Sequence, residues 1–162
     1  MKKSQEKFGD TSFSYALAND AMGAWFVQHS KFNEARQYFQ IAADLDDDLM
    51  GAHEPLMSRL ALAMTDAKIG DACWASSDAE KLVAKIQNVY GNDTPYLLMP
   101  YEMHGLFLMQ CSQREKDRAW ASLDLFNTLA KKLVDQGKIS ADMVKGMKAT
   151  NAAIYMKLGI GS

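Results

Sequence analysis

The sequence has 162 residues, of which 48% are hydrophobic and 23% charged, with a formal net charge of −2. This is the composition of an ordinary soluble globular chain, long enough for one sizeable core. The lysines and arginines are scattered among acids, so they give no basic field for a nucleic acid, and no apolar run approaches the roughly 18 to 20 residues of a membrane span. We therefore expect a cytoplasmic protein without a membrane span that binds no nucleic acid, with a flexible segment over residues 1–10 and one domain over 11–162.

Two amphipathic runs open this domain. Small and aromatic residues recur at spacings of three and four, first at Ala16, Asn19, Met22, Gly23 and Phe26, then at Phe32, Ala35, Phe39 and Ala42. Those are helical spacings, and the short polar break over residues 28–31 predicts that the two helices are antiparallel. We expect a first helix from a cap at Asp10, Thr11 or Ser12 to Gln28, and a second over Phe32 to Leu45, giving a hairpin at about 12–46.

Proline and glycine delimit the second hairpin, at about 50–90. Pro55 is tolerated in a first turn, so we expect the third helix to begin between Met50 and Glu54 and to end near Gly70. Residues 77–80, with the sequence SDAE, have the form of a capping box. They predict that the fourth helix begins at Ser77, after a connection longer than the first.

The third hairpin, at about 96–136, has an apolar first helix. Pro100 favours a start near Leu97 to Met99, and residues 97–111 are apolar on nearly all sides, which predicts a helix buried at the centre of the stack. Within it, Gly105 is placed to play the part of Gly23. A sixth helix follows from about Arg114, and a seventh over about 140–158 is expected to cap the open end of the stack.

The residues Gly23, Phe26, Phe32, Ala35, Phe39 and Ala42 resemble the small-and-aromatic signature of the tetratricopeptide repeat, a 34-residue helix-turn-helix unit. In that register the unit spans Ala16 to Leu49, about one fifth of the chain, and departs from the pattern at Asn19 and Asp47. The resemblance implies an all-α fold of antiparallel hairpins stacked as a short superhelix, with about seven helices. The other two hairpins are degenerate repeats, and the third requires a shift of about two residues that puts Ala119 in the place of Ala35.

In this family the first helix of each hairpin lines a concave groove that receives a peptide or a helix of a partner. The implied groove residues are Asp20, Ala24, Val27 and Gln28 in the first helix, Glu54, Ser58, Ala61 and Leu62 in the third, and Glu102, Leu106, Met109 and Gln110 in the fifth. Acids and apolar residues occur together there, so we expect a basic-hydrophobic segment as ligand. The resemblance therefore implies a protein-interaction module, for example a bacterial-type chaperone or adaptor, without a catalytic residue, metal or other cofactor.

Two other functions stay open. The chain is a self-associating structural subunit if terminal helices pair between copies, or a metal-dependent enzyme if His53, Glu54, Glu102 and His104 converge. The sequence around these residues lacks the H-E-x-x-H spacing that places two metal ligands on one helix face. The acids Asp44, Asp46 and Asp48 look like the start of a calcium loop but lack its glycine and its glutamate, so we interpret these three acids as a solvated turn. Cys73 and Cys111 lie far apart and predict free thiols, with a bridge only if folding brings them together. The methionines in the middle of the chain suit either the core or the groove.

Overall fold

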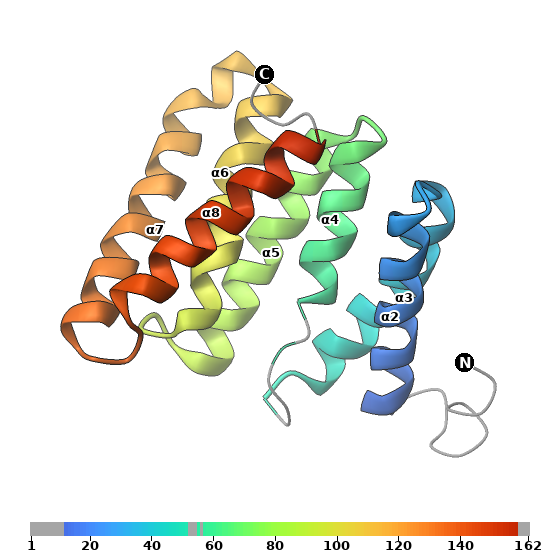
Figure 1. The fold of residues 1–162 in the computed structure, drawn as a ribbon, viewed down its shortest axis with the longest axis horizontal. Helices are drawn as coiled ribbons and strands as arrows, with labels where there is room; N and C mark the ends of the chain where they lie inside the picture. Colours follow the sequence, from blue (N-terminus) through green and yellow to red (C-terminus); the bar gives the residue numbers. More distant parts are fainter. Residues whose placement is uncertain (1–11, 52–54, 56, 159–162) are drawn as a thin grey trace.

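The computed structural model describes residues 12–51, 55 and 57–158, with side chains as far as Ala149, so the predicted flexible segment 1–10 lies outside it. Within these ranges there are seven α-helices, two short 3₁₀-helices and no β-strand, which confirms the predicted all-α class. The helices are α2 (Phe13–Gln28), α3 (Phe32–Leu49), α4 (Ser58–Lys68), α5 (Ala72–Tyr90), η1 (Pro95–Leu97), α6 (Leu98–Cys111), η2 (Gln113–Glu115), α7 (Lys116–Asp135) and α8 (Ala141–Leu158). Figure 1 shows the successive pairs α2–α3, α4–α5 and α6–α7 side by side, with α8 running obliquely across the later ones.

The first helix and the turn after it have the predicted limits. Ser12 caps α2, because its side-chain oxygen accepts a hydrogen bond from the Tyr15 N–H at 3.2 Å. The turn to α3 is closed by Ser30, which has a φ of 58°, and by the Lys31 N–H, which donates to the Phe26 carbonyl at 2.9 Å. A left-handed residue followed by such a bond ends a helix without leaving its last carbonyls unpaired.

The second helix of this hairpin is longer than predicted. α3 ends at Leu49, so the acids expected in a solvated turn lie in its last turns. Acids are unfavourable at a helix C-terminus. Basic side chains offset this, because Arg59 Nη2 lies 2.6 Å from Asp47 and 3.3 Å from Asp44, and Lys85 Nζ lies 3.6 Å from Asp47.

The third helix begins later than predicted. α4 starts at Ser58, not between Met50 and Glu54. Met57, which precedes it, has a φ of 59°. A left-handed residue cannot continue a right-handed helix, so Pro55 lies outside α4 rather than in its first turn.

The fourth helix begins earlier than predicted. α5 starts at Ala72, directly after a turn in which Gly70 has a φ of 104°. The side chain of Asp71 caps it by accepting a hydrogen bond from the Trp74 N–H at 3.1 Å. The predicted capping box at Ser77 therefore lies inside the helix, and the long connection before it does not exist.

The third hairpin is close to the prediction. α6 starts at Leu98, within the predicted window, and places Pro100 in its first turn, where a missing N–H leaves no helical hydrogen bond unmade. Leu98, Phe107 and Leu108 are each at most 2% exposed, which confirms that α6 is a buried helix. α7 starts at Lys116, two residues later than expected, because the 3₁₀-helix η2 takes the preceding residues.

The last helix caps the stack as predicted. Ser140 accepts a hydrogen bond from the Met143 N–H at 3.0 Å at the start of α8. Val144 and Met147 then pack against the main core. In Figure 1 this helix, drawn in red, starts beside the last turn of α7 and crosses the bundle.

The core has two parts. The larger contains residues of α4 to α7, among them Leu60, Leu82, Leu98, Met103, Phe107 and Leu133. The smaller joins α3 to α4 and consists of Ala35, Phe39, Ala43 and Leu62. The first hairpin is thus held to the rest of the chain by the smaller cluster. None of the helices in the described ranges has the length and apolar content that crossing a lipid bilayer requires.

The prediction of free thiols is wrong. Cys73, in the first turn of α5, and Cys111, the last residue of α6, form a disulfide with their Cα atoms 4.7 Å apart. The early start of α5 makes this possible, because it brings Cys73 into the helix that pairs with α6. The bond links the second hairpin to the third.

Candidate functional site

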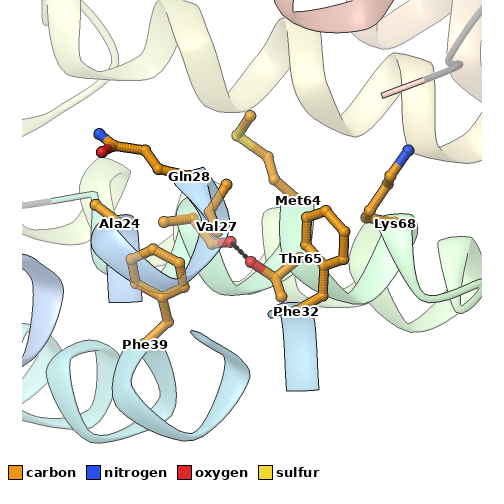
Figure 2. Close-up of a pocket in the computed structure, with 9 residues that line it drawn as sticks. Ala24, Val27, Gln28, Phe32, Phe39, Met64, Thr65 and Lys68 are labelled. Carbon is orange, nitrogen blue, oxygen red and sulfur yellow. Dashed lines mark hydrogen bonds between the residues drawn. The ribbon is translucent and has the colours of Figure 1, made fainter. Parts of the chain in front are cut away.

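A groove opens between α2 and α4 on the side where the first hairpin meets the second. Its lining residues are Ala24, Val27 and Gln28 of α2, Phe32 and Phe39 of α3, and Ala61, Met64, Thr65 and Lys68 of α4 (Figure 2). We call this the α2–α4 groove. Its hollow measures about 280 Å³, at the lower limit for a small-molecule site but enough for an anchoring side chain of a partner.

The back of the groove is formed by a close approach of α2 and α3. A Cβ atom on Gly23 would lie 2.7 Å from the ring of Phe39, so the ring fits only against a glycine. Phe26 and Tyr38 stack beside it, with ring centroids 5.1 Å apart and planes at 15°. The Phe39 side chain therefore fills the space beside Gly23, as the small-and-aromatic pattern predicted, and it also forms an apolar wall of the groove.

The groove has three polar lining residues, Gln28, Thr65 and Lys68, of which Thr65 is buried. Thr65 is already paired, since its hydroxyl donates to the Ala61 carbonyl at 2.8 Å, the bond drawn in Figure 2. Gln28 and Lys68 are exposed, one on each wall. The Lys68 ammonium lies 5.8 Å from the centroid of the Phe32 ring. None of the ion pairs formed by the described residues involves Lys68.

A hydrogen bond between the walls closes the other end. The Ser58 hydroxyl donates to the Asp20 carboxylate at 2.8 Å. Burial raises the pKa of Asp20, and the hydrogen bond from Ser58 acts in the opposite direction. Both residues were predicted to contact a ligand. They instead contact each other, so of the predicted α2 residues Ala24, Val27 and Gln28 line the groove and Asp20 does not.

Of the residues predicted in the third helix, only some line this groove. Ala61 lines the groove, but Leu62 is 1% exposed in the smaller core cluster and Ser58 is fully buried. Glu54 lies outside the described residues. The α4 residues that line the groove without having been predicted there are Met64, Thr65 and Lys68, and Phe32 and Phe39 of α3 were not predicted there either.

The groove residues of α4 differ from the predicted ones because the first two hairpins are spaced further apart than expected. The turn with Ser30 (φ 58°) recurs at Gly70 (φ 104°), 40 residues later. The Lys31 bond to Phe26 likewise recurs as the Asp71 N–H donating to the Asp66 carbonyl, again at 2.9 Å. The tetratricopeptide repeat is 34 residues long, so its register places the residues of the third helix too early in the chain. At the observed spacing, the equivalents of Ala24 and Gln28 are Met64 and Lys68. A glycine followed by a capping residue was the signal that could have located this turn.

The predicted α6 residues do not extend this groove. Glu102 is 9% exposed, and Leu106 is half-buried against the main core. Met109 lines a separate hollow of about 260 Å³, together with Lys116 and Trp120. The groove is therefore confined to the first two hairpins.

The residues of the metal-enzyme hypothesis do not assemble where they can be located. His104 Nδ1 lies 3.1 Å from the Ser122 hydroxyl, which itself donates to the Tyr101 carbonyl at 2.9 Å, so Nδ1 is the donor. Burial lowers the pKa of His104, which favours the neutral ring. No group of three or more His, Cys, Asp or Glu residues in the described part of the chain could hold a metal ion, and His53 and Glu54 fall outside that part.

A larger hollow of about 410 Å³ lies beside His104, between α5, α6 and α7. Its charged and polar side chains are mostly paired with one another. Arg118 lies 3.4 Å from Glu80 and 2.8 Å from Glu115, and Gln87 donates to the Tyr101 hydroxyl at 3.0 Å. The α2–α4 groove is the better candidate for a binding site, because its walls are apolar and its lysine forms no ion pair with another described residue. Neither a protein-family model nor a curated protein matches this chain.

Proposed function

We propose that this chain is a protein-binding module that holds a segment of a partner protein in the α2–α4 groove. The observation that carries the proposal is the groove itself. Val27 and Met64 face each other across an open apolar hollow whose back is a rigid phenylalanine ring. Anchors of bound segments commonly occupy such pockets, because burying one large apolar side chain contributes about 1.5–3 kcal/mol.

We further propose that the hairpins are degenerate tetratricopeptide-like units and that the module works as a chaperone or adaptor. Two features support a repeat. The turn after α2 recurs after α4, and the close approach of Gly23 to Phe39 recurs in the third hairpin, where a Cβ on Gly105 would lie 2.8 Å from Leu123. The contact between Gly105 and Leu123 matches that between Gly23 and Phe39 when the register of the third hairpin is shifted by about two residues, as expected from the sequence.

The test uses two substitutions on one helix. Peptides selected from a displayed random library for binding to the chain are titrated against Val27→Asp and Trp25→Ser. Val27 lines the groove, whereas Trp25 is 46% exposed and lies about 200° further round α2. We expect Val27→Asp to weaken binding more than about tenfold and Trp25→Ser to leave it unchanged. Equal binding to wild type and Val27→Asp would place the peptide elsewhere and refute the proposal.

Self-association is the second candidate. Leu17, Ala21 and Trp25 form an exposed stripe along α2, and Leu17 and Trp25 are 48% and 46% exposed. A stripe at i, i+4 and i+8 on the first helix of the described residues is a suitable surface for a second copy. Sedimentation at two concentrations tests it. A monomer at both concentrations excludes this function, whereas a dimer that Leu17→Asp dissociates supports it.

A further inference from the structure

We infer that the α2–α4 groove takes a partner segment in which a large apolar side chain stands beside a carboxylate, and that Lys68 binds this carboxylate. The inference rests on the proposed function and adds the chemistry of the partner. The ligand expected from the sequence was basic and hydrophobic, so the charge is reversed.

The first reason is that the groove has a positive charge that forms no ion pair with any residue described in the structure. Lys68 is the one charged residue among the nine that line it. Neighbouring acids are already used, since Asp71 caps α5 at the Trp74 N–H and the Asp66 carboxylate pairs with Arg36. An exposed ammonium without an acid partner favours a carboxylate on the ligand and disfavours a lysine or arginine there.

The second reason is that the two predicted groove acids within the described residues, Asp20 and Glu102, do not face the groove; the third, Glu54, lies outside those residues. Asp20 accepts the hydrogen bond from Ser58 at the closed end, and Glu102 is buried in α6. A basic side chain entering the groove would therefore meet Lys68 without a compensating acid among the lining residues. Like charges placed together across an interface disfavour binding.

The third reason is the position of the ammonium relative to the apolar hollow. Lys68 lies over the Phe32 ring at the mouth, while Phe39 and Val27 lie deeper. A side chain anchored against Phe39 brings its own backbone to the mouth. A carboxylate on a neighbouring residue then lies within reach of Lys68, beside apolar surface where water screens the attraction less than in bulk solvent.

We assign the partner to a protein segment rather than to a fatty acid, which shares the same chemistry. The hollow of about 280 Å³ is smaller than most small-molecule sites and suits one anchoring side chain. The rest of a peptide can lie outside it, along the exposed residues of α2 and α4.

The experiment uses three helical peptides of one length that differ only around a single phenylalanine, which is flanked on both sides by Glu, Gln or Lys. Fluorescence anisotropy at low ionic strength gives the dissociation constants. For wild type we expect the Glu peptide to bind about tenfold more tightly than the Lys peptide, with the Gln peptide between them. Lys68→Glu should reverse this order, and Lys68→Gln should nearly abolish the difference.

Lys31→Glu is the matched control. Lys31 is also an exposed lysine near a ring, 6.0 Å from the centroid of Phe26, but it does not line the groove. We expect the order of the three peptides to stay as in wild type. A reversal by Lys31→Glu as large as that by Lys68→Glu would show a general effect of net charge and overturn the role of Lys68.

Other outcomes separate this inference from the proposed function. If the three peptides bind equally and Val27→Asp abolishes all binding, the groove binds segments but the carboxylate inference is wrong. If wild type binds none of the three, both are wrong. If dodecanoate binds more tightly than the Glu peptide and depends on Lys68, the ligand is a fatty acid and the assignment to a protein segment is overturned.

Discussion

Ser58 on α4 donates a hydrogen bond to the carboxylate of Asp20 on α2 at 2.8 Å. The bond joins the two walls of the α2–α4 groove at its closed end. Ser58 is fully buried and Asp20 is half-buried, so water cannot fully replace either partner. This contact acts together with the smaller core cluster and with the ion pairs Arg36–Asp66 and Arg59–Asp47 between α3 and α4 to set the position of the first hairpin against α4, and with it the width of the groove.

Removing the donor should destabilise the chain. Ser58→Ala leaves the Asp20 carboxylate in the same partly buried place without its partner. We expect a loss of about 1–3 kcal/mol, the usual result of leaving a buried polar group unsatisfied, measured by urea unfolding. Ser77→Ala is the control, because Ser77 lies within α5 and forms no hydrogen bond to a described residue; it should change stability by less than about 0.5 kcal/mol. Equal effects of the two substitutions would contradict the role of Ser58.

Asp20→Asn should change how stability depends on pH. Burial raises the pKa of Asp20 in the folded state above the ordinary value of 3.8. Between pH 3.8 and this raised pKa, the folded state therefore binds more protons than the unfolded state. The free energy of unfolding of the wild type therefore falls as the pH rises through this window. Asparagine does not titrate, so the stability of Asp20→Asn relative to wild type should increase across the same window.

Paired urea titrations of wild type and Asp20→Asn from about pH 3 to pH 7 measure this difference. Asp66, whose pKa burial also raises, is present in both proteins, so its contribution cancels. A difference in unfolding free energy that is constant with pH would show that the Asp20 pKa is the same in the folded and unfolded states.

Gly23→Ala tests the back of the groove. The new methyl group would lie 2.7 Å from the Phe39 ring, so α2 must move away from α3 or the ring must turn. We expect a loss of about 1–3 kcal/mol from overpacking, although alanine favours a helix by about 1 kcal/mol. Gly146→Ala in α8 is the control, because its methyl group meets nothing within 4 Å and should stabilise the chain. Thermal unfolding of both variants gives the signs, and a stabilising Gly23→Ala would contradict the close packing.

The first hairpin could be predicted because the signals that define it are local. Ser12 caps α2, and the glycine at position 23 faces the aromatic ring at position 39, as the spacing of small and large residues indicated. In the second hairpin, Ser77 has the form of a capping box, but Gly70 followed by Asp71 is also a start signal. Burial agrees with the earlier start, because Ala75 is 0% exposed and would precede the helix if α5 began at Ser77.

Groove residues could be predicted only where their positions depend on spacing within a single helix. Val27 follows from the repeat within α2, whereas Lys68 depends on the distance between hairpins, which is 40 residues from Ser30 to Gly70. The disulfide could not be predicted for a related reason, which is the position at which α5 begins. With α5 starting at Ser77, Cys73 would lie in a loop, and only the observed start pairs it with Cys111.

Breaking the disulfide should lower stability by about 4 kcal/mol. Cys73 and Cys111 are 38 residues apart, and the loss follows from the chain entropy that a loop of this length regains in the unfolded state. Urea unfolding with and without a thiol reductant measures it. Titration with a thiol reagent should find no free thiol in the native chain and two after reduction. In the cytoplasmic location expected from the sequence, thiols are kept reduced, so the chain there would lack this stabilisation.

The double substitution Cys73→Ser and Cys111→Ser separates the disulfide from other effects of the reductant. This variant should unfold at a lower urea concentration than the oxidised wild type, close to that of the reduced wild type, and the reductant should not shift it further. Because α5 and α6 also pack through the buried side chains of Leu82, Ile86 and Leu98, we expect the variant to stay helical by circular dichroism before the transition. A wild-type transition that the reductant leaves in place, with two thiols titrated, would show that the bond forms without contributing to the free energy of unfolding.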